Sequence, residues 1–259
     1  MNNLWGIFVM ADKIDQNIKG DNNCQIVVQG DYVVGLNEKE VLAIVESRGY
    51  QTKDKIIEII REVLNNIPND KKIKPDIRVF VPLLQQLSYS MNENYIKEIY
   101  KKMLESTMNS DKASSVHPSF INILSQLSSD EIKILDALPL STLNFEPLIS
   151  MNMIIGKKGT EITKVKYFSD IGYGKCQYPS NICKYIENLE RLKLIEIPYG
   201  KKLANENLYK RLIEHPALES IRSHNKLNNE IEIVYKYDKM YYTLTSFGMD
   251  FISCCKKWN

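Results

Sequence analysis

Residues 114–139 read SSVHPSFINILSQLSSDEIKILDALP, and the fold of the chain is organised around this stretch. Its apolar residues recur at helical spacing in two blocks separated by a serine-rich break. Ser128 and Glu131 form a capping box, in which each side chain satisfies a free backbone N–H at the start of a helix. The spacing therefore predicts two helices, 119–127 and 130–138, that meet at one turn.

His117 lies at the start of this stretch, and histidine titrates close to neutral pH. Because it precedes Pro118 and a predicted helix start, we expect a capping or structural role for it rather than catalysis. His215 also precedes a proline, and His224 is expected in a polar loop. The histidines and cysteines lack the close pairing of a metal site, and no nucleophile–base spacing is evident. We therefore expect no metal, no cofactor, no catalytic residue and no enzyme.

The composition is that of an ordinary globular protein, with 259 residues, 44% apolar and 25% charged. A net charge of +2 is too small to imply a nucleic-acid partner by itself. The five cysteines are scattered and odd in number, which favours a reducing cytoplasm. Residues 4–10 are apolar but too short for a bilayer span, and they lack a signal peptide's basic start and cleavage site. We expect a cytoplasmic protein without stable membrane insertion.

A β-hairpin is predicted near the N-terminus, where residues 25–29 and 32–35 flank a Gly-Asp pair. A lone hairpin is marginally stable in water and exposes two edges that can pair with another chain. We therefore predict an oligomerisation element, with a hairpin packed on its own chain as the alternative. The residues of this element are Gln25, Ile26, Val27, Val28, Tyr32, Val33 and Val34.

Amphipathic spacing predicts two helices after this hairpin, and the polar segment 67–72 predicts a domain boundary. The first unit is then residues 1–70. About four further helices with short links predict a small helical bundle over residues 71–140. Pro82 lies within the first of them and is expected to kink that helix or to mark its true start.

Residues 141–259 are predicted to form a winged-helix-like domain. LERLKLI at 189–195 ends a predicted helix, and residues 231–237 alternate as a strand. A tight turn is predicted at 238–239, followed by a second strand, and LTSFG at 244–248 opens the last helix. Cys254 and Cys255 follow as an apolar pair at the end of that helix.

A winged helix usually reads DNA with one helix, and binding to phosphates needs a surplus of positive charge. Between residues 178 and 196 three basic side chains are balanced by three glutamates. We therefore favour a packing or protein-binding module over a DNA reader. Residues 156–160 lack the spacing of a phosphate-binding loop and predict a surface turn. The candidate contacts for a nucleic acid or another partner are Lys157, Lys158, Lys164, Lys166, Lys184, Arg191 and Lys193.

Three short patterns carry a resemblance to a known family: LESTM at 104–108, HPSF at 117–120, and LSQLS at 124–128 followed by Glu131. With these residues the chain resembles the Abi-alpha family of bacterial proteins over about residues 74–255. The resemblance implies abortive infection, which is a defence against phage. Its motif residues pack and cap helices, so the resemblance implies no catalytic residue.

The expected protein is mainly α with small β elements: an N-terminal β-hairpin plus helices, a central helical bundle and a C-terminal winged-helix-like module. We expect a non-enzymatic component of antiphage defence that acts through protein–protein contacts and self-association. Its partners would be a second copy of itself and a phage or host protein. The alternative is a winged-helix DNA-binding transcriptional regulator.

Overall fold

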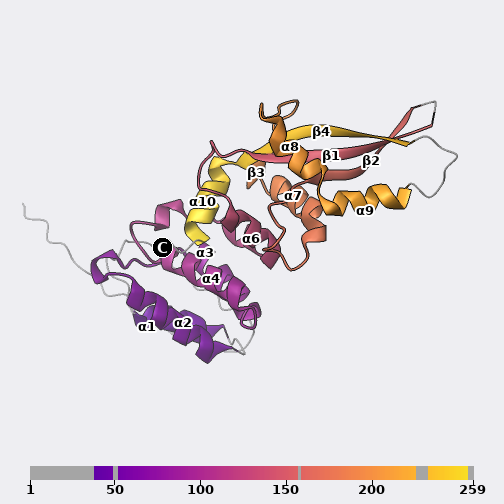
Figure 1. Cartoon of the computed structure of the whole chain (residues 1–259). Helices are drawn as coiled ribbons and strands as arrows, with labels where there is room; N and C mark the ends of the chain where they lie inside the picture. Colours follow the sequence, from indigo (N-terminus) through magenta and orange to yellow (C-terminus); the bar gives the residue numbers. More distant parts are fainter. Residues whose placement is uncertain (1–37, 49–51, 157–158, 226–232, 256–259) are drawn as a thin grey trace, which may run out of the picture. The chain divides into compact units, whose positions relative to one another are not determined.

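The computed structural model describes residues 38–48, 52–156, 159–225 and 233–255 (Figure 1). Over these ranges the chain is mainly helical with small β elements, as the sequence predicts, and the described strands form one small antiparallel sheet. The winged-helix arrangement predicted for residues 141–259 stays a prediction. The predicted hairpin at residues 25–34 lies outside the described residues. The helices are α1 (Glu38–Ser47), α2 (Lys53–Asn66), α3 (Ile77–Tyr89), α4 (Asn94–Thr107), α5 (Ser119–Leu124), α6 (Ser129–Ala137), α7 (Ile182–Arg191), α8 (Glu206–Ile213), α9 (Pro216–Asn225) and α10 (Ser246–Cys255). The strands are β1 (Glu146–Ile155), β2 (Thr160–Phe168), β3 (Ile195–Glu196) and β4 (Ile233–Leu244).

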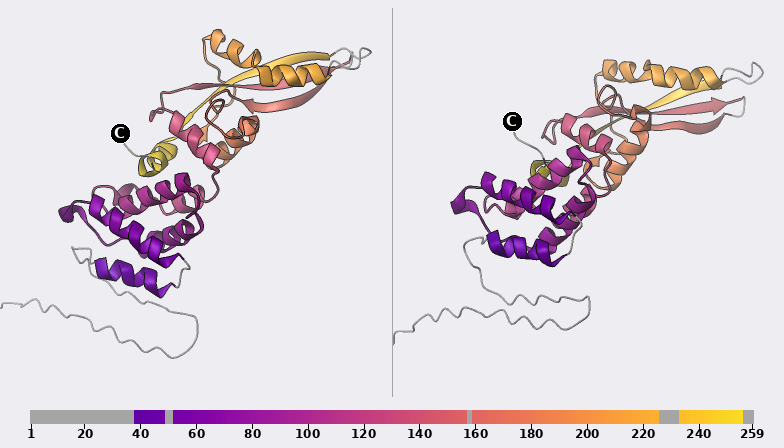
Figure 2. Two further views of the ribbon diagram at one scale, coloured as in Figure 1. Left: turned by 60° about the horizontal axis from the view of Figure 1, so that its bottom comes forward. Right: turned by 90° about the horizontal axis from the view of Figure 1, so that it is seen from below.

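Helices α1 to α4 pack side by side on apolar stripes (Figure 2). Ile60 of α2, Phe80 of α3 and Met103 of α4 are completely buried. The link at residues 67–72 joins this core, because Ile67 is buried as well. Helices on both sides of residue 70 thus share apolar contacts, and the division of the chain at residues 70 and 140 stays a prediction. None of the described helices is long and apolar enough to cross a membrane.

Helix α3 begins well before Pro82, so the prediction that this proline marks the helix start is wrong. The Asp76 side chain caps α3 by accepting a hydrogen bond from the backbone N–H of Arg78 at 2.8 Å. Pro82 then lies inside a continuous helix. The Asp76 cap and the buried apolar face of α3 therefore stabilise the helix by more than Pro82 destabilises it.

The capping box between α5 and α6 is confirmed. The Glu131 carboxylate accepts the backbone N–H of Ser128 at 2.7 Å, and the Ser128 hydroxyl accepts the backbone N–H of Glu131 at 3.3 Å. His117 caps the start of α5, since its Nδ1 accepts the backbone N–H of Ser119 at 3.2 Å. Phe120 packs against Phe251 of α10, with ring centroids 5.4 Å apart. Residues 114–139 therefore cap two helices and pack α5 against α10; we call this stretch the hinge.

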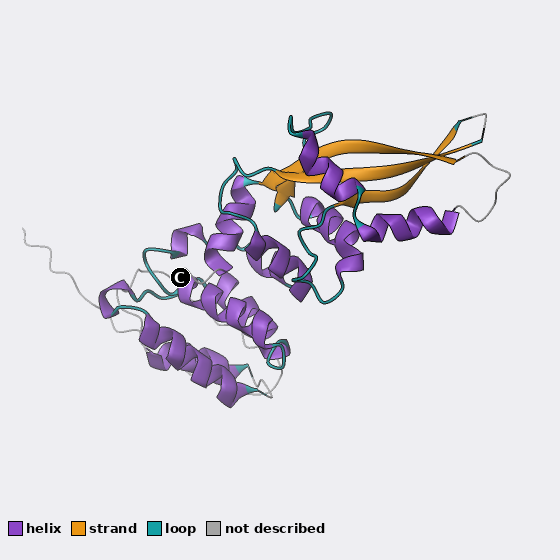
Figure 3. Cartoon of the chain, viewed as in Figure 1, coloured by secondary structure: helices purple, strands orange, loops and turns teal. Residues whose placement is uncertain are grey.

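The sheet has the strand order β2-β1-β4-β3, and all its pairs are antiparallel (Figure 3). β1 and β2 form a hairpin that the sequence reasoning missed. Its turn begins and ends on left-handed glycines, Gly156 (φ 64°) and Gly159 (φ 68°), and the N–H of Gly159 donates to the carbonyl of Gly156 at 3.0 Å. Such backbone angles favour glycine, which explains why glycine stands at both positions.

The tight turn predicted at residues 238–239 is wrong, because β4 is one continuous strand. Asp238 pairs with Ser150 and Lys239 pairs with Ile149, within an unbroken ladder along β1. The Asp238 carboxylate accepts the side-chain N–H of Asn152 at 2.7 Å. A neighbouring strand therefore stabilises an Asp-Lys pair that resembles a turn in sequence.

The junction of α7 with α10 explains the LERLKLI and LTSFG patterns. Lys193 has φ 60°, and the N–H of Leu194 donates back to the carbonyl of Leu189 at 3.1 Å, which is a Schellman helix end. The N–H of Thr245 then donates to the carbonyl of Leu194 at 3.1 Å. A Cβ on Gly248 would lie 2.0 Å from that carbonyl oxygen, so α10 approaches α7's end only with glycine there.

Candidate functional site

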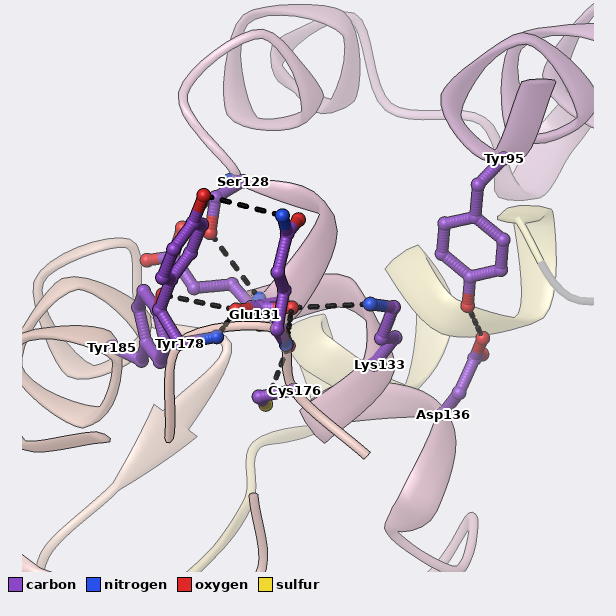
Figure 4. A network of polar contacts seen from close by, with 10 residues as sticks. Tyr95, Ser128, Glu131, Lys133, Asp136, Cys176, Tyr178 and Tyr185 are labelled. Atoms are coloured by element: carbon purple, nitrogen blue, oxygen red, sulfur yellow. Dashed lines mark hydrogen bonds and ion pairs between the residues drawn. The ribbon is translucent and has the colours of Figure 1, made fainter. Parts of the chain in front are cut away.

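Asp130 joins α6 to the segment before α7 through a polar network, whose partners Lys133, Tyr178 and Tyr185 are labelled in Figure 4. The residue is only 4% exposed. Its carboxylate accepts the backbone N–H groups of Gln177 and Tyr178 at 2.8 Å each. It also accepts the Tyr185 hydroxyl at 3.1 Å and the Lys133 ammonium at 3.1 Å. Residues far apart in the chain are therefore held together by one buried charge.

The environment of Asp130 suits a structural carboxylate. Burial, the largest influence, would raise its pKa, but the donated hydrogen bonds hold the pKa below its ordinary value. A carboxylate has roughly four acceptor sites, and four donors engage this one. No lone pair is left to take a proton from a substrate, so Asp130 is not suited to acid–base chemistry.

Glu131 is also 4% exposed and also tied to α7. Besides its capping bonds to Ser128, its carboxylate accepts the side-chain N–H of Asn188 at 2.6 Å. Asn188 donates again to the backbone carbonyl of Gln126 at 3.1 Å. The adjacent carboxylates Asp130 and Glu131 thus hold α6 and α7 together rather than facing a shared ligand.

A cavity of about 480 Å³ opens beside this network, between the ends of α3 and α4, the link from α5 to α6, and the segment before α7. We call it the tyrosine groove, because four tyrosines line it: Tyr89, Tyr100, Tyr178 and Tyr185. Its lining also contains the carboxylates of Glu93 and Asp130. No lysine or arginine is among the described residues that line it.

The tyrosines of the groove fall into two kinds. Tyr89 and Tyr178 are 73% and 57% exposed, so their rings are open to solvent. Tyr100 is buried, and burial raises its pKa to about 12. Burial also raises the pKa of Tyr185, whose hydroxyl is bonded to Asp130. Two neutral tyrosines thus form the base of the groove, and two uncovered rings are available to a partner.

None of the five described basic residues that were predicted as contacts lines the tyrosine groove. Lys164 and Lys166 line a second cavity of about 430 Å³ between β2, α7 and α9. The Lys166 ammonium lies 3.2 Å from a Glu187 carboxylate oxygen and 4.3 Å from the centre of the Tyr167 ring. The structure therefore brings Lys164 and Lys166 together.

The remaining basic candidates have other settings. Arg191 donates to the side-chain oxygens of Asn188 at 2.7 Å and Gln126 at 3.0 Å, so it supports the hinge. Lys193 is the left-handed residue at the end of α7, and Lys184 is exposed on α7. Lys157 and Lys158 lie outside the described residues. Whether any of these seven residues contacts a partner stays a prediction.

The described cysteines are unpaired thiols: Cys176, Cys183, Cys254 and Cys255. Burial raises the pKa of Cys183 to about 11, and it also raises the pKa of Cys254. Cys254 is 3% exposed and packs in the core, in keeping with the expected apolar pair. Within the described ranges, no cluster of three or more histidine, cysteine or acidic side chains could hold a metal ion.

The sequence reasoning missed the tyrosine groove. Its two exposed rings are 89 residues apart in number, at positions 89 and 178, and neither lies in a recognisable pattern. Asp130 was visible only as an acidic residue in the first turn of a helix. An unusually high count of 15 tyrosines was the available signal, since tyrosine is enriched at protein interfaces.

Fold and site together define a mainly helical protein with a small antiparallel sheet and an open groove rich in tyrosine. A family model described as "Abortive infection alpha" matches residues 50–255, and the chain therefore belongs to this family. No curated protein matches the sequence. A solved structure of the uncharacterized protein from the hydrocarbon-degrading marine bacterium Alcanivorax borkumensis SK2 is 15% identical, with a TM-score of 0.34. The match covers 52% of this chain and 90% of that one, and a likeness this low carries no argument here.

Proposed function

We propose that this chain is a non-enzymatic abortive-infection protein that binds a phage or host protein in the tyrosine groove. Membership of the family supports the link to abortive infection. The observation that carries the binding role is the pair of uncovered rings, Tyr89 and Tyr178, over a cavity of about 480 Å³. Exposed aromatic side chains gathered in one place are typical of protein-interaction surfaces.

The non-enzymatic part of the proposal is supported by the state of the two adjacent buried carboxylates beside the groove. Asp130 is occupied by four donors, and its neighbour Glu131 by the capping box and Asn188. A catalytic acid or base needs a free site within reach of a substrate. The other carboxylate of the groove, Glu93, is exposed, and no histidine, cysteine, lysine or arginine is among the described residues that line the groove with it. Apart from Glu93 the groove offers rings, hydroxyls, amides and backbone, which suit binding without chemistry.

Phage challenge of bacteria that express the full chain tests this function. We expect the unaltered chain to lower the plating efficiency of at least one phage in a panel. The double variant Tyr89→Ala with Tyr178→Ala should lose that protection at equal expression. The control is Tyr199→Ala, which removes a fully exposed tyrosine (102%) that does not line the groove. Protection that is absent throughout, or equal in the groove variant, would contradict the proposal.

Self-association through residues 25–34 is the second part of the proposal, and it rests on the edge-pairing pattern of that segment. Charged residues on an edge strand oppose pairing between chains. We expect the full chain to be an oligomer and the variant Val27→Asp with Val33→Asp to be a monomer by light scattering. The helical content should be unchanged by circular dichroism. A monomeric unaltered chain would refute this part.

A DNA-binding regulator is the second candidate function. The favouring observation is the pair Lys164 and Lys166 beside α7, which the winged-helix interpretation would place near DNA. Against it, Lys184 and Arg191 of α7 are balanced by Glu187 and Glu190. Retention on a DNA column at low salt that is lost in Lys164→Glu would favour the regulator. No retention by the unaltered chain would exclude it.

A further inference from the structure

The geometry points to a basic protein segment as the occupant of the tyrosine groove, with an arginine side chain against the open rings. This inference rests on the proposed function, since it takes the occupant to be a protein and names its chemistry. The expected occupant is a segment that bears arginine, because the acidic lining of the groove and its two exposed tyrosine rings both favour a guanidinium group.

Charge is the first argument. The two charged residues that line the groove, Glu93 and Asp130, are both acidic. The charge of Asp130 is balanced by the ammonium of Lys133. No such ion pair is formed by Glu93 within the described residues. Glu93 precedes α4, and its side chain makes no capping hydrogen bond to the start of that helix. Among the described residues no lysine or arginine pairs with it, so a positive group entering the groove would meet an unbalanced carboxylate.

The open rings are the second argument. A cation over the face of a tyrosine is attracted by the electron density of the ring, and a planar guanidinium stacks better than an ammonium. Tyr89 and Tyr178 are the exposed rings of the groove, at 73% and 57%. The Tyr178 hydroxyl accepts a hydrogen bond from the Gln177 side chain at 3.2 Å, which leaves the ring as the free part of the residue.

The immobility of the base is the third argument. The backbone N–H of Tyr178 is bonded to the buried Asp130 carboxylate at 2.8 Å, and Tyr185 is bonded to the same group. The network therefore fixes the backbone of Tyr178, which positions its ring. A binding surface that is rigid before the partner arrives loses little conformational freedom on binding.

A peptide-binding experiment on the full chain tests the inference. The probe is a short fluorescent peptide of alternating glycine and arginine, followed by anisotropy at low and at physiological salt. The comparison peptides carry citrulline, which keeps the shape of arginine without its charge, or glutamate. We expect saturable binding of the arginine peptide and binding of the citrulline peptide that is weaker by about tenfold or more.

Matched variants locate the binding. Tyr178→Ala and Glu93→Gln should each weaken the arginine peptide by about tenfold. The controls are Tyr199→Ala and Glu58→Gln, which alter an exposed tyrosine and an exposed glutamate outside the groove and should change nothing. No binding at millimolar peptide, equal binding of the citrulline peptide, or equal binding by the groove variants would each overturn the inference.

The two proposals fail in different ways. If the groove variants lose phage protection but no arginine peptide binds, the function stands and the basic occupant is wrong. If the peptide binds in the groove but the same variants protect fully, the occupant stands and the role of the groove in defence is wrong.

Discussion

Asp130→Asn removes the charge at the centre of the polar network without changing the size of the side chain. One acceptor oxygen becomes an NH₂ group, so two of the four donors lose their acceptor. The Tyr185 hydroxyl can turn to accept a hydrogen bond, but the backbone N–H of Tyr178 cannot. A buried unsatisfied donor costs about 1–3 kcal/mol, and the two surviving bonds weaken by about 1 kcal/mol each as they become neutral. We expect a total loss of about 3–5 kcal/mol.

The assay is thermal unfolding followed by circular dichroism, with denaturant unfolding for the free energy. A loss of this size lowers Tm by about 6–20 °C in a domain of this size. Asp54→Asn is the matched control, because Asp54 also lies in the first turn of a helix and is exposed. It should lose only the interaction with the helix dipole, about 0.3–1 kcal/mol.

The pH dependence of stability tests the role of the Asp130 charge independently. The folded chain holds the pKa of Asp130 below that of an unfolded aspartate, which is about 3.9. The unfolded state therefore takes up the proton first, so the stabilisation is full above about pH 4 and is lost as the pH falls through the folded pKa. Asparagine does not titrate, and the stability gap between the two chains should narrow below about pH 4. A gap that persists into acid, or a loss no larger than that of Asp54→Asn, would refute this account.

Three further predictions follow from the same structure. Gly248→Ala should destabilise the chain by about 2 kcal/mol or more in denaturant unfolding, because the new Cβ would lie 2.0 Å from the Leu194 carbonyl oxygen. This loss outweighs the better helix propensity of alanine. The control Ser253→Ala, at an exposed position of the same helix, should be near neutral. Lys193→Gly should stabilise by about 0.5–1 kcal/mol in the same assay, because its φ of 60° suits glycine; a destabilised variant would contradict the Schellman end. Alkylation at pH 8, resolved by peptide mass spectrometry, should modify Cys183 about a hundredfold slower in the folded than in the unfolded chain, since partial burial raises its pKa to about 11. Equal rates would contradict the raised pKa.

The local parts of the fold could be predicted well. The capping box of Ser128 and Glu131, the capping role of His117 and the apolar stripe of α2 depend on residues within one or two turns of each other. Short-range spacing carries this information directly, because backbone N–H groups at a helix start must find acceptors nearby. The family resemblance rested on the same kind of residue.

The sheet could not be predicted in the same way. Asp238 and Lys239 resemble a turn in sequence, and only the ladder with Ser150 and Ile149 makes them strand. The β1–β2 hairpin was missed for a related reason: a surface turn was predicted at residues 156–160, but the segments on either side of it were not recognised as strands. Strand pairing depends on a partner far away in the chain, and propensity says little about that partner.

By itself the sequence determined where the described helices of the hinge begin, which residues cap them, and that the chain is mainly helical. Only the tertiary structure shows which distant segments this stretch contacts. Asp130 is bonded to N–H groups 47 and 48 residues further along the chain, and Tyr89 and Tyr178 line one groove from different elements. The physical reason is that capping is satisfied within a few residues, whereas a buried charge and an open groove need partners that only folding brings together.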